Sequence, residues 1–241
     1  MSAADELKAW ARRGAFEAKT VIARYPALAL PIAKRRHGEP VDDATEIVIE
    51  GFPRSGTSFA VAAFRRAQGR DVAIACHVHA PAQILEGARR NIPTVLIVRE
   101  PEATCVSFAI RNPHLSMRQA IRGYLRFHEP LASVRRRIEV ATFDEVTKDL
   151  GTVIDRVNAR YGSTYARYEH GEDAEAAVFD EIDDDYRKRL SGESFDRAVA
   201  RPSEARNAMK PKAATAYRDE GVAALRLRAE RIYARLTDAR G

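Results

Sequence analysis

Residues 46–67 read EIVIEGFPRSGTSFAVAAFRRA, and this segment constrains the fold of the chain more than any other. Ile47, Val48 and Ile49 form a short apolar run of β-branched residues, which is typical of a buried strand. The chain then turns between Gly51 and Gly56, and beyond Gly56 apolar residues recur at helix spacing. The segment therefore predicts a strand, a tight glycine-bounded loop and a helix, in that order.

This layout is typical of a phosphate-binding loop, because the first N–H groups of a helix have no partner inside it and the helix dipole is positive there. The loop departs from the nucleoside-triphosphate pattern GxxxxGK[ST], since Thr57 stands in the lysine position and Ser58 follows it. The cation lies within the loop instead, at Arg54. The pattern favours a site for one phosphate. The alternative is a glycine turn capped by Thr57 or Ser58 that binds no ligand.

The composition of the chain indicates one globular domain with an anionic ligand. Its 241 residues are 45% hydrophobic, and the net charge is +6. The basic residues are scattered and no recognition motif accompanies them, so we expect no nucleic-acid partner. Cys76 and Cys105 lack the spacing of a metal site, and no apolar run is long enough to span a membrane. We expect a cytoplasmic protein that needs no metal.

Strands alternate with helices along residues 46–162, which indicates an α/β fold. We expect a three-layer domain of the P-loop type, in which helices flank a central, mainly parallel sheet. After the strand of residues 47–49, further strands are expected at residues 72–75, 94–98 and 138–142. Helices are expected at residues 4–24, 81–88, 101–110, 116–135, 146–161, 172–185 and 222–236.

The chain divides into three parts that we expect to form a single domain, residues 1–241. A helical leader, residues 1–45, is expected to be broken at Pro26 and Pro31. The core of residues 46–162 follows, and a helical part, residues 163–241, closes the chain. Residues 201–212, RPSEARNAMKPK, are basic and are expected to form a loop.

Three candidate functional positions lie just past the ends of expected strands. Gly51 follows the first strand, His79 comes shortly after the second, and Arg99 directly follows the third. Ligands of parallel sheets bind at the carboxyl ends of the strands, so we expect these three positions to converge on one edge.

Three motifs together resemble the sulfotransferases that use 3'-phosphoadenosine 5'-phosphosulfate, as a small member of the bacterial type. The family's first motif reads roughly PKSGTTW, and residues 53–59 of this chain read PRSGTSF. The second is an arginine ending a strand with a serine eight positions later, matched by Arg99 and Ser107. The third is a His-x-Pro triplet about twenty residues before that arginine, matched by His79-Ala80-Pro81. The resemblance covers residues 46–162.

The resemblance implies a nucleotide-binding core and a role for each matching residue. Arg54 would contact the sulfuryl group, and Phe59 would stack on the adenine ring. Arg99 and Ser107 would bind the 3'-phosphate, for which an arginine fork beside a hydroxyl is a strong clamp. No metal is implied. The co-substrate would be held by Arg54, Ser55, Gly56, Thr57, Ser58, Phe59, Arg99 and Ser107.

His79 is the candidate general base, because an imidazole can take a proton from an acceptor near neutral pH. A structural histidine is the alternative, and His77 competes for the same role. The acceptor would be a small molecule, a carbohydrate or a lipid with a hydroxyl or amine. The basic motif that closes over the 3'-phosphate in cytosolic members has no clear counterpart. Its candidates are Arg201, Arg206, Lys210 and Lys212.

Two other functions were considered for the same loop. A small-molecule kinase, or another nucleotide-phosphate transferase, would need a lysine after Gly56 and a magnesium-binding aspartate after residues 94–98, and the chain has neither. A nucleotide-binding module without catalysis is the non-enzymatic alternative.

Overall fold

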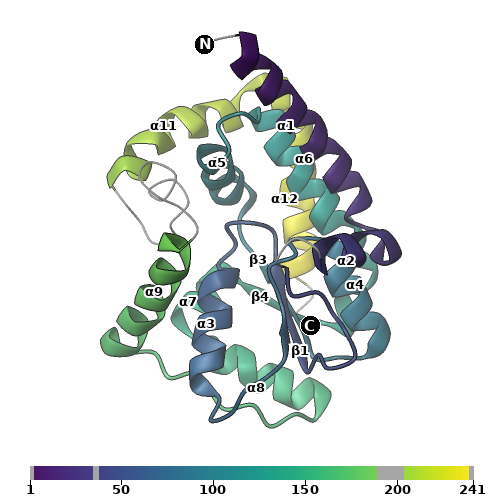
Figure 1. Cartoon of the computed structure of the whole chain (residues 1–241), viewed down its shortest axis with the longest axis vertical. Helices are drawn as coiled ribbons and strands as arrows, with labels where there is room; N and C mark the ends of the chain where they lie inside the picture. The colour runs from purple at the N-terminus through teal and green to yellow at the C-terminus, as the bar shows by residue number, and fades with distance from the viewer. Residues whose placement is uncertain (1–2, 35–37, 189–203, 239–241) are drawn as a thin grey trace.

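A parallel sheet forms the centre of the molecule (Figure 1). The computed structural model describes residues 3–34, 38–188 and 204–238. Its strands are β1 (Ile47–Gly51), β2 (Ile74–Ala75), β3 (Thr94–Val98) and β4 (Glu139–Thr142), in the order β2-β1-β3-β4. All three pairings are parallel. The predicted α/β architecture with a parallel sheet is therefore confirmed.

Side chains of the central strands alternate between two apolar layers. Ile49 and Ile97 pack with helices α3 (Thr57–Ala67), α8 (Leu150–Tyr161) and α9 (Glu172–Arg187). Val48 and Leu96 pack on the other face with α4 (Pro81–Arg90), α5 (Pro101–Arg111), α6 (Met117–His128) and α12 (Ala223–Thr237). Because both faces are covered, the strands are mostly apolar, as is typical of parallel sheets, although β1 contains Glu50 and β4 contains Glu139.

The strand register brings three chain segments to the same edge of the sheet. Gly51 at the end of β1 pairs with Ile97 of β3, and Val98 of β3 pairs with Thr142 of β4. The loop before α3, the residue after β3 and the residue after β4 consequently lie next to one another.

The predicted helices differ from the structure mainly where they end. The helix expected at residues 116–135 ends at His128, because Pro130 follows and the chain continues in the 3-10 turns Glu129–Ser133 and Arg135–Arg137. The helix expected at residues 146–161 is two helices, α7 (Phe143–Lys148) and α8. Asp149 separates them and caps α8 through Thr152.

Two predictions based on proline and charge are wrong. Pro31 lies inside helix α2 (Pro26–Lys34) and does not break it. The expected loop at residues 201–212 is helical from Glu204, because α11 (Glu204–Arg218) runs through Pro211 and packs along α5. Tertiary packing there outweighs the cost of one missing backbone donor.

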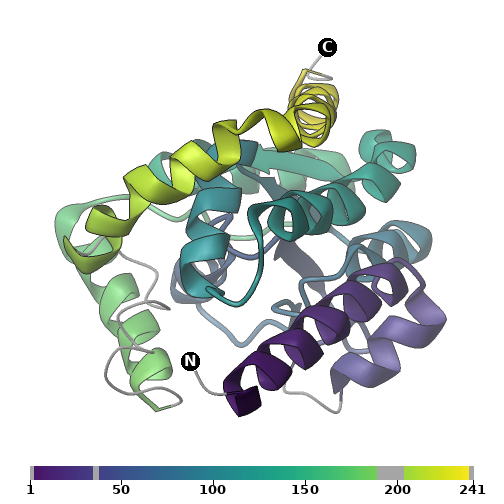
Figure 2. The same cartoon turned by 90° about the horizontal axis from the view of Figure 1, so that it is seen from above.

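The N-terminal helix α1 (Ala3–Ile22) lies along α6 (Figure 2). Arg13 donates to the carbonyl of His114 at 2.6 Å, and Arg126 of α6 bonds Glu17 and Thr20. The ring of Phe16 contacts that of Phe108 at a centroid distance of 5.8 Å. The division into residues 1–45, 46–162 and 163–241 stays a prediction.

Stability is expected to fall in mild acid because of His128. This histidine is fully buried, donates from Nδ1 to the carbonyl of Tyr124 at 2.8 Å, and its pKa is lowered by burial to about 4. The unfolded chain, with a histidine pKa of about 6.5, binds the proton first as the pH falls, so the free energy of unfolding decreases between those values. We expect a loss of about 2 kcal/mol at pH 5 relative to pH 7.5, measured by urea denaturation. His128→Phe should flatten this profile, and an unchanged profile would exclude His128 as its origin.

Candidate functional site

The loop of residues 52–56 leaves the first turn of α3 open to an anion. Gly56 is the N-cap of α3, with φ of 91°, and offers no side chain to the helix. The N–H groups of the first turn have no partner within the helix, and the dipole adds positive charge there. Arg54 has a φ of 78°, which is an unusual backbone conformation for a residue with a side chain.

Gly51 is required by close packing beneath the loop. A Cβ atom at this position would lie 2.7 Å from the carbonyl oxygen of Ile97 and 3.1 Å from Oγ1 of Thr57. The absence of a side chain therefore lets the end of β1 approach both β3 and the start of α3.

Two hydroxyl groups of the loop have unused hydrogen-bonding capacity. The side chains of Ser55 and Thr57 are buried, and among the described residues neither hydroxyl has a hydrogen-bond partner. Buried polar groups without partners are rare in native proteins. These hydroxyls, together with the open helix end, fit the binding of a phosphate or sulfate.

Arg99 and Ser107 both contact this loop. Arg99 donates to the carbonyl oxygen of Arg54 at 3.0 Å, and Nε of Arg54 donates to Oγ of Ser107 at 3.1 Å. The hydroxyl of Tyr124 fixes the backbone of Arg99 by donating to its carbonyl at 3.0 Å. Three residues singled out from the sequence therefore lie together.

Phe143 adds an aromatic ring that the sequence motifs did not indicate. The guanidinium carbon of Arg99 lies 3.9 Å from the centre of this ring, and a Cβ atom at Gly56 would lie 3.1 Å from Cδ2 of Phe143. Phe143 directly follows β4, which neighbours β3, so the order of the strands could have indicated it.

His79 contacts the end of β1, just before the loop. Its Nδ1 lies 2.9 Å from the carbonyl oxygen of Gly51 and 3.2 Å from Oε1 of Glu50. Both atoms are acceptors, so in the neutral form of the imidazole Nδ1 carries the hydrogen and Nε2 keeps its lone pair. The tautomer is therefore suited to a general base acting through Nε2.

Glu50 is the residue that positions His79. Its fully buried carboxylate accepts from the backbone N–H groups of Gly51, Val78 and His79 at 2.8–3.0 Å. Burial raises the pKa of Glu50, but the charge of His79 and hydrogen bonds from His79 and Gly51 outweigh it. The pKa of Glu50 consequently lies below its usual value. The sequence did not indicate a role for Glu50, because this residue lies in an otherwise apolar strand.

His77 is more exposed than His79 and lies beside it, with a ring-to-ring distance of 5.9 Å. Both histidines have positive φ values, 59° for His77 and 52° for His79, which residues with a side chain rarely adopt. Gly51 and Glu50 hold the ring of His79 in place, and whether His79 or His77 acts as a base stays a prediction.

Tyr186 and Arg111 extend the site on the side of α9. Nη1 of Arg111 donates to the hydroxyl of Tyr186 at 3.3 Å, and this hydroxyl is also hydrogen-bonded to Ser58. Burial raises the pKa of Tyr186, but Arg111, Arg54 and the bond to Ser58 outweigh it, so its pKa lies below the usual value. Arg111 lies one helical turn beyond Ser107. The sequence gave no signal for Tyr186, which is far away in the chain.

Phe59 lies apart from these residues. Its side chain is buried, and its ring packs against those of Phe179, Tyr168 and His170. Stacking on an adenine ring would require Phe59 to leave this cluster, so that predicted role is not supported by its position. The faces of α3 explain the difference, since Phe59 points into the apolar layer between α3 and α9.

The basic residues expected to cover the site are only partly described. Arg201 and the side chain of Arg206 lie outside the described residues. Lys210 and Lys212 are exposed on α11. Their role over a phosphate stays a prediction.

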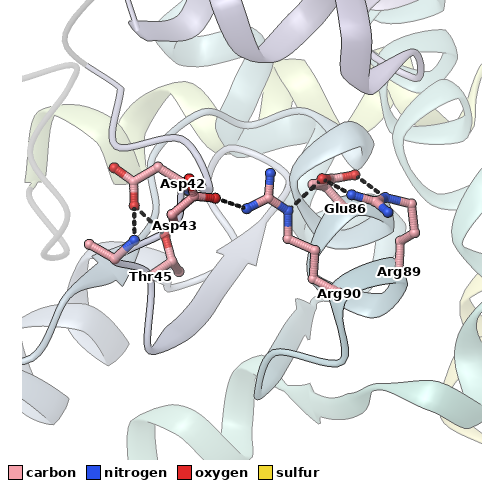
Figure 3. A network of polar contacts seen from close by, with 7 residues as sticks. Asp42, Asp43, Thr45, Glu86, Arg89 and Arg90 are labelled. Atoms are coloured by element: carbon pink, nitrogen blue, oxygen red, sulfur yellow. Dashed lines mark hydrogen bonds and ion pairs between the residues drawn. The ribbon is translucent and has the colours of Figure 1, made fainter.

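A groove of about 1110 Å³ lies away from the loop, at the opposite edge of the sheet. Residues preceding β1 and β2 line it together with α2 and the end of α4. On its wall Glu86 pairs with Arg89 at 2.8 Å and with Arg90 at 2.6 Å, and Arg90 also bonds Asp43 (Figure 3). Hydrogen bonding to Arg89 is the main reason that the pKa of Glu86 falls to about 2. The two arginines on this wall are thus already paired with carboxylates.

Within residues 3–34, 38–188 and 204–238, no three His, Cys, Asp or Glu side chains gather in a way that could hold a metal ion.

Comparison with known proteins gave likenesses to solved structures but no match by sequence. No family model matches the chain, and no curated protein is a significant match. Among solved structures, the chain is similar to the crystal structure of mouse sulfotransferase SULT7A1 complexed with PAP. The sequences are 14% identical, the match covers 88% of this chain and 93% of that chain, and the TM-score is 0.49. At these values the likeness does not decide the function, which has to be argued from the residues around the loop.

Proposed function

We propose that this protein is a sulfotransferase that moves a sulfuryl group from 3'-phosphoadenosine 5'-phosphosulfate to a hydroxyl or amine. The observation that carries the proposal is the contact of Arg54 with both Arg99 and Ser107, at 3.0 and 3.1 Å. These contacts join two anion-binding elements, one at the start of α3 and one after β3. A nucleotide with phosphates on both its 5' and 3' positions matches such a pair.

The loop and the first turn of α3 would hold the 5'-phosphate. Backbone N–H groups at Gly56, Thr57 and Ser58 and the hydroxyls of Ser55 and Thr57 are the donors there. Arg99 and Ser107 would hold the 3'-phosphate, with Arg111 one turn further along α5. The ring of Phe143, beside Arg99, is better situated than that of Phe59 to contact the base.

Arg54 and His79 would carry the chemistry. Negative charge grows on the departing phosphate as the sulfur–oxygen bond breaks, and Arg54 would stabilise that charge. His79 would take the proton of the acceptor at Nε2, while Glu50 stabilises the resulting imidazolium. The acceptor belongs to a broad class of small molecules, carbohydrates or lipids that bear a hydroxyl or amine.

We expect 3'-phosphoadenosine 5'-phosphate, the desulfated product, to stabilise the protein against heat. At one hundred times its dissociation constant a ligand adds about 2.7 kcal/mol to the free energy of unfolding, which corresponds to a rise of roughly 5–10 °C in Tm. Adenosine 5'-phosphate should give a smaller shift, and Arg99→Ala should remove the difference between the two. A folded protein that millimolar bisphosphate leaves unshifted would refute the proposal. Transfer of labelled sulfur in the presence of EDTA would separate it from a magnesium-dependent kinase.

Tyr186→Phe is expected to weaken binding of the same nucleotide by roughly fivefold, because one hydroxyl donor at the loop is lost. In the unchanged protein, affinity should also decline as the pH rises, since a tyrosine of lowered pKa becomes an anion and repels the phosphate. This alkaline decline should be weaker in Tyr186→Phe, as measured by isothermal titration between pH 7 and 10. Equal affinities and parallel profiles would place Tyr186 outside the nucleotide site.

A further inference from the structure

Most of the large apolar side chains that the described residues expose lie in the first two helices. Seven such side chains are exposed, and six of them fall within residues 7–32. They are Leu7, Trp10 and Val21 of α1, Tyr25 just before α2, and Leu28 and Ile32 of α2. We call these six residues the N-terminal apolar surface.

On α1 the exposed apolar residues form one stripe. Leu7, Trp10, Gly14, Ala18 and Val21 follow one another at intervals of three and four, which places them on one face, and all five are exposed. Phe16, which packs against α6, lies on the opposite side of the helix. One solvent-exposed face of the helix is therefore apolar, where a helix of a globular protein is normally charged.

Helix α2 repeats this arrangement. Ala29 and Ala33 face α4 and pack with Ala82, whereas Leu28 and Ile32 are 55% and 44% exposed. Figure 2 shows α1 and α2 together on the outer flank of the molecule.

Helix α1 also carries a row of basic side chains beside its apolar stripe. Lys8, Arg12 and Lys19 are exposed and form a row along α1, at intervals of four and seven. The described residues 3–34 contain six basic side chains and three acidic ones, Asp5, Glu6 and Glu17, and Glu17 is paired with Arg126. The net charge of this segment is thus positive (6 − 3 = +3).

We propose that the N-terminal apolar surface docks onto an anionic lipid bilayer. Exposed Trp and Leu residues flanked by Lys and Arg are the combination that binds a helix in the plane of a membrane interface. A second copy of the chain fits less well, because a two-fold contact would bring the positively charged segments of both copies together. None of the described helices is long and apolar enough to span the bilayer, so the contact is with its surface.

Trp10 is the only tryptophan of the chain, so its fluorescence reports directly on this surface. Addition of phosphatidylserine-containing vesicles to the full-length protein should shift the emission to shorter wavelength and carry the protein into the vesicle pellet. Pure phosphatidylcholine vesicles should bind much less, and high salt should weaken binding to the anionic vesicles.

Leu7→Glu and Leu28→Glu should each reduce binding to anionic vesicles by at least about fivefold and keep the fold, because both side chains are exposed. Leu227→Glu, at the seventh exposed position, on α12, is the matched control and should bind like the unchanged protein. No emission shift, or a shift that needs no vesicles and grows with protein concentration, would overturn the proposal. A shift without vesicles would instead indicate self-association. Vesicle binding and self-association are both measured without the proposed sulfotransferase activity.

Discussion

Replacing Arg54 by alanine is expected to lower the rate of sulfuryl transfer by about 10²–10³-fold at saturating donor. Arg54 is half-buried, and its Nε is held on Ser107 at 3.1 Å, so its charge is fixed beside the loop before the reaction starts. A fixed charge favours the transition state, where the leaving phosphate is most negative. The measurement is the initial rate of label transfer from sulfur-labelled donor to an acceptor found by labelling a metabolite extract.

Arg54→Lys is the matched control for this change. It keeps the positive charge but loses the planar fork, so its rate should lie between those of the alanine variant and the unchanged protein. Thermal unfolding of all three proteins separates a catalytic loss from a folding defect. Full activity of folded Arg54→Ala would remove this residue from the chemistry.

His79→Ala is expected to lower the rate of transfer by about 10²–10⁴-fold and to leave the affinity for 3'-phosphoadenosine 5'-phosphate unchanged. The imidazole is anchored through Nδ1, which leaves Nε2 as the proton acceptor. Loss of a base slows the chemical step, whereas the nucleotide-binding groups at the loop stay in place. Transfer kinetics and calorimetric titration measure the two effects separately.

His77→Ala is the natural comparison, because the two rings are 5.9 Å apart. We expect this variant to retain most of the activity. The opposite pattern, with His77→Ala inactive and His79→Ala active, would assign the base to His77.

The local pattern of the sequence was sufficient to predict the loop and the strands beside it. The strand predicted at residues 94–98 is β3 without any change of bounds, because five consecutive apolar or β-branched residues suit a strand covered on both faces. The same pattern placed Arg99 directly after this strand, whereas Ser107 was singled out by the resemblance to a family motif that has a serine eight positions later. Their contacts with Arg54 bring together residues that are 45 and 53 positions apart.

Residues that depend on contacts between distant segments could not be predicted. In the sequence Glu50 is one residue of a strand, and its role depends on hydrogen bonds from the backbone of residues 78–79, which are distant in the chain. Tyr186 reaches Arg111 from 75 residues away, and no local pattern links them. Phe59 was given a role by its place in a motif, but the rotation of α3 turns it into the core. Helix α11 was not predicted, because its first part is basic and contains Pro211, which indicate a loop. The packing of α11 on α5, which stabilises the helix, cannot be read from the sequence.

The anchoring of His79 has a consequence for heat inactivation. The carboxylate of Glu50 binds three backbone amides, two of which belong to the segment after β2 and one to the end of β1. The position of the His79 ring is thus set by the main chain at the end of β1 and just after β2, two adjoining strands. Activity that depends on this histidine should persist on warming until the sheet itself melts.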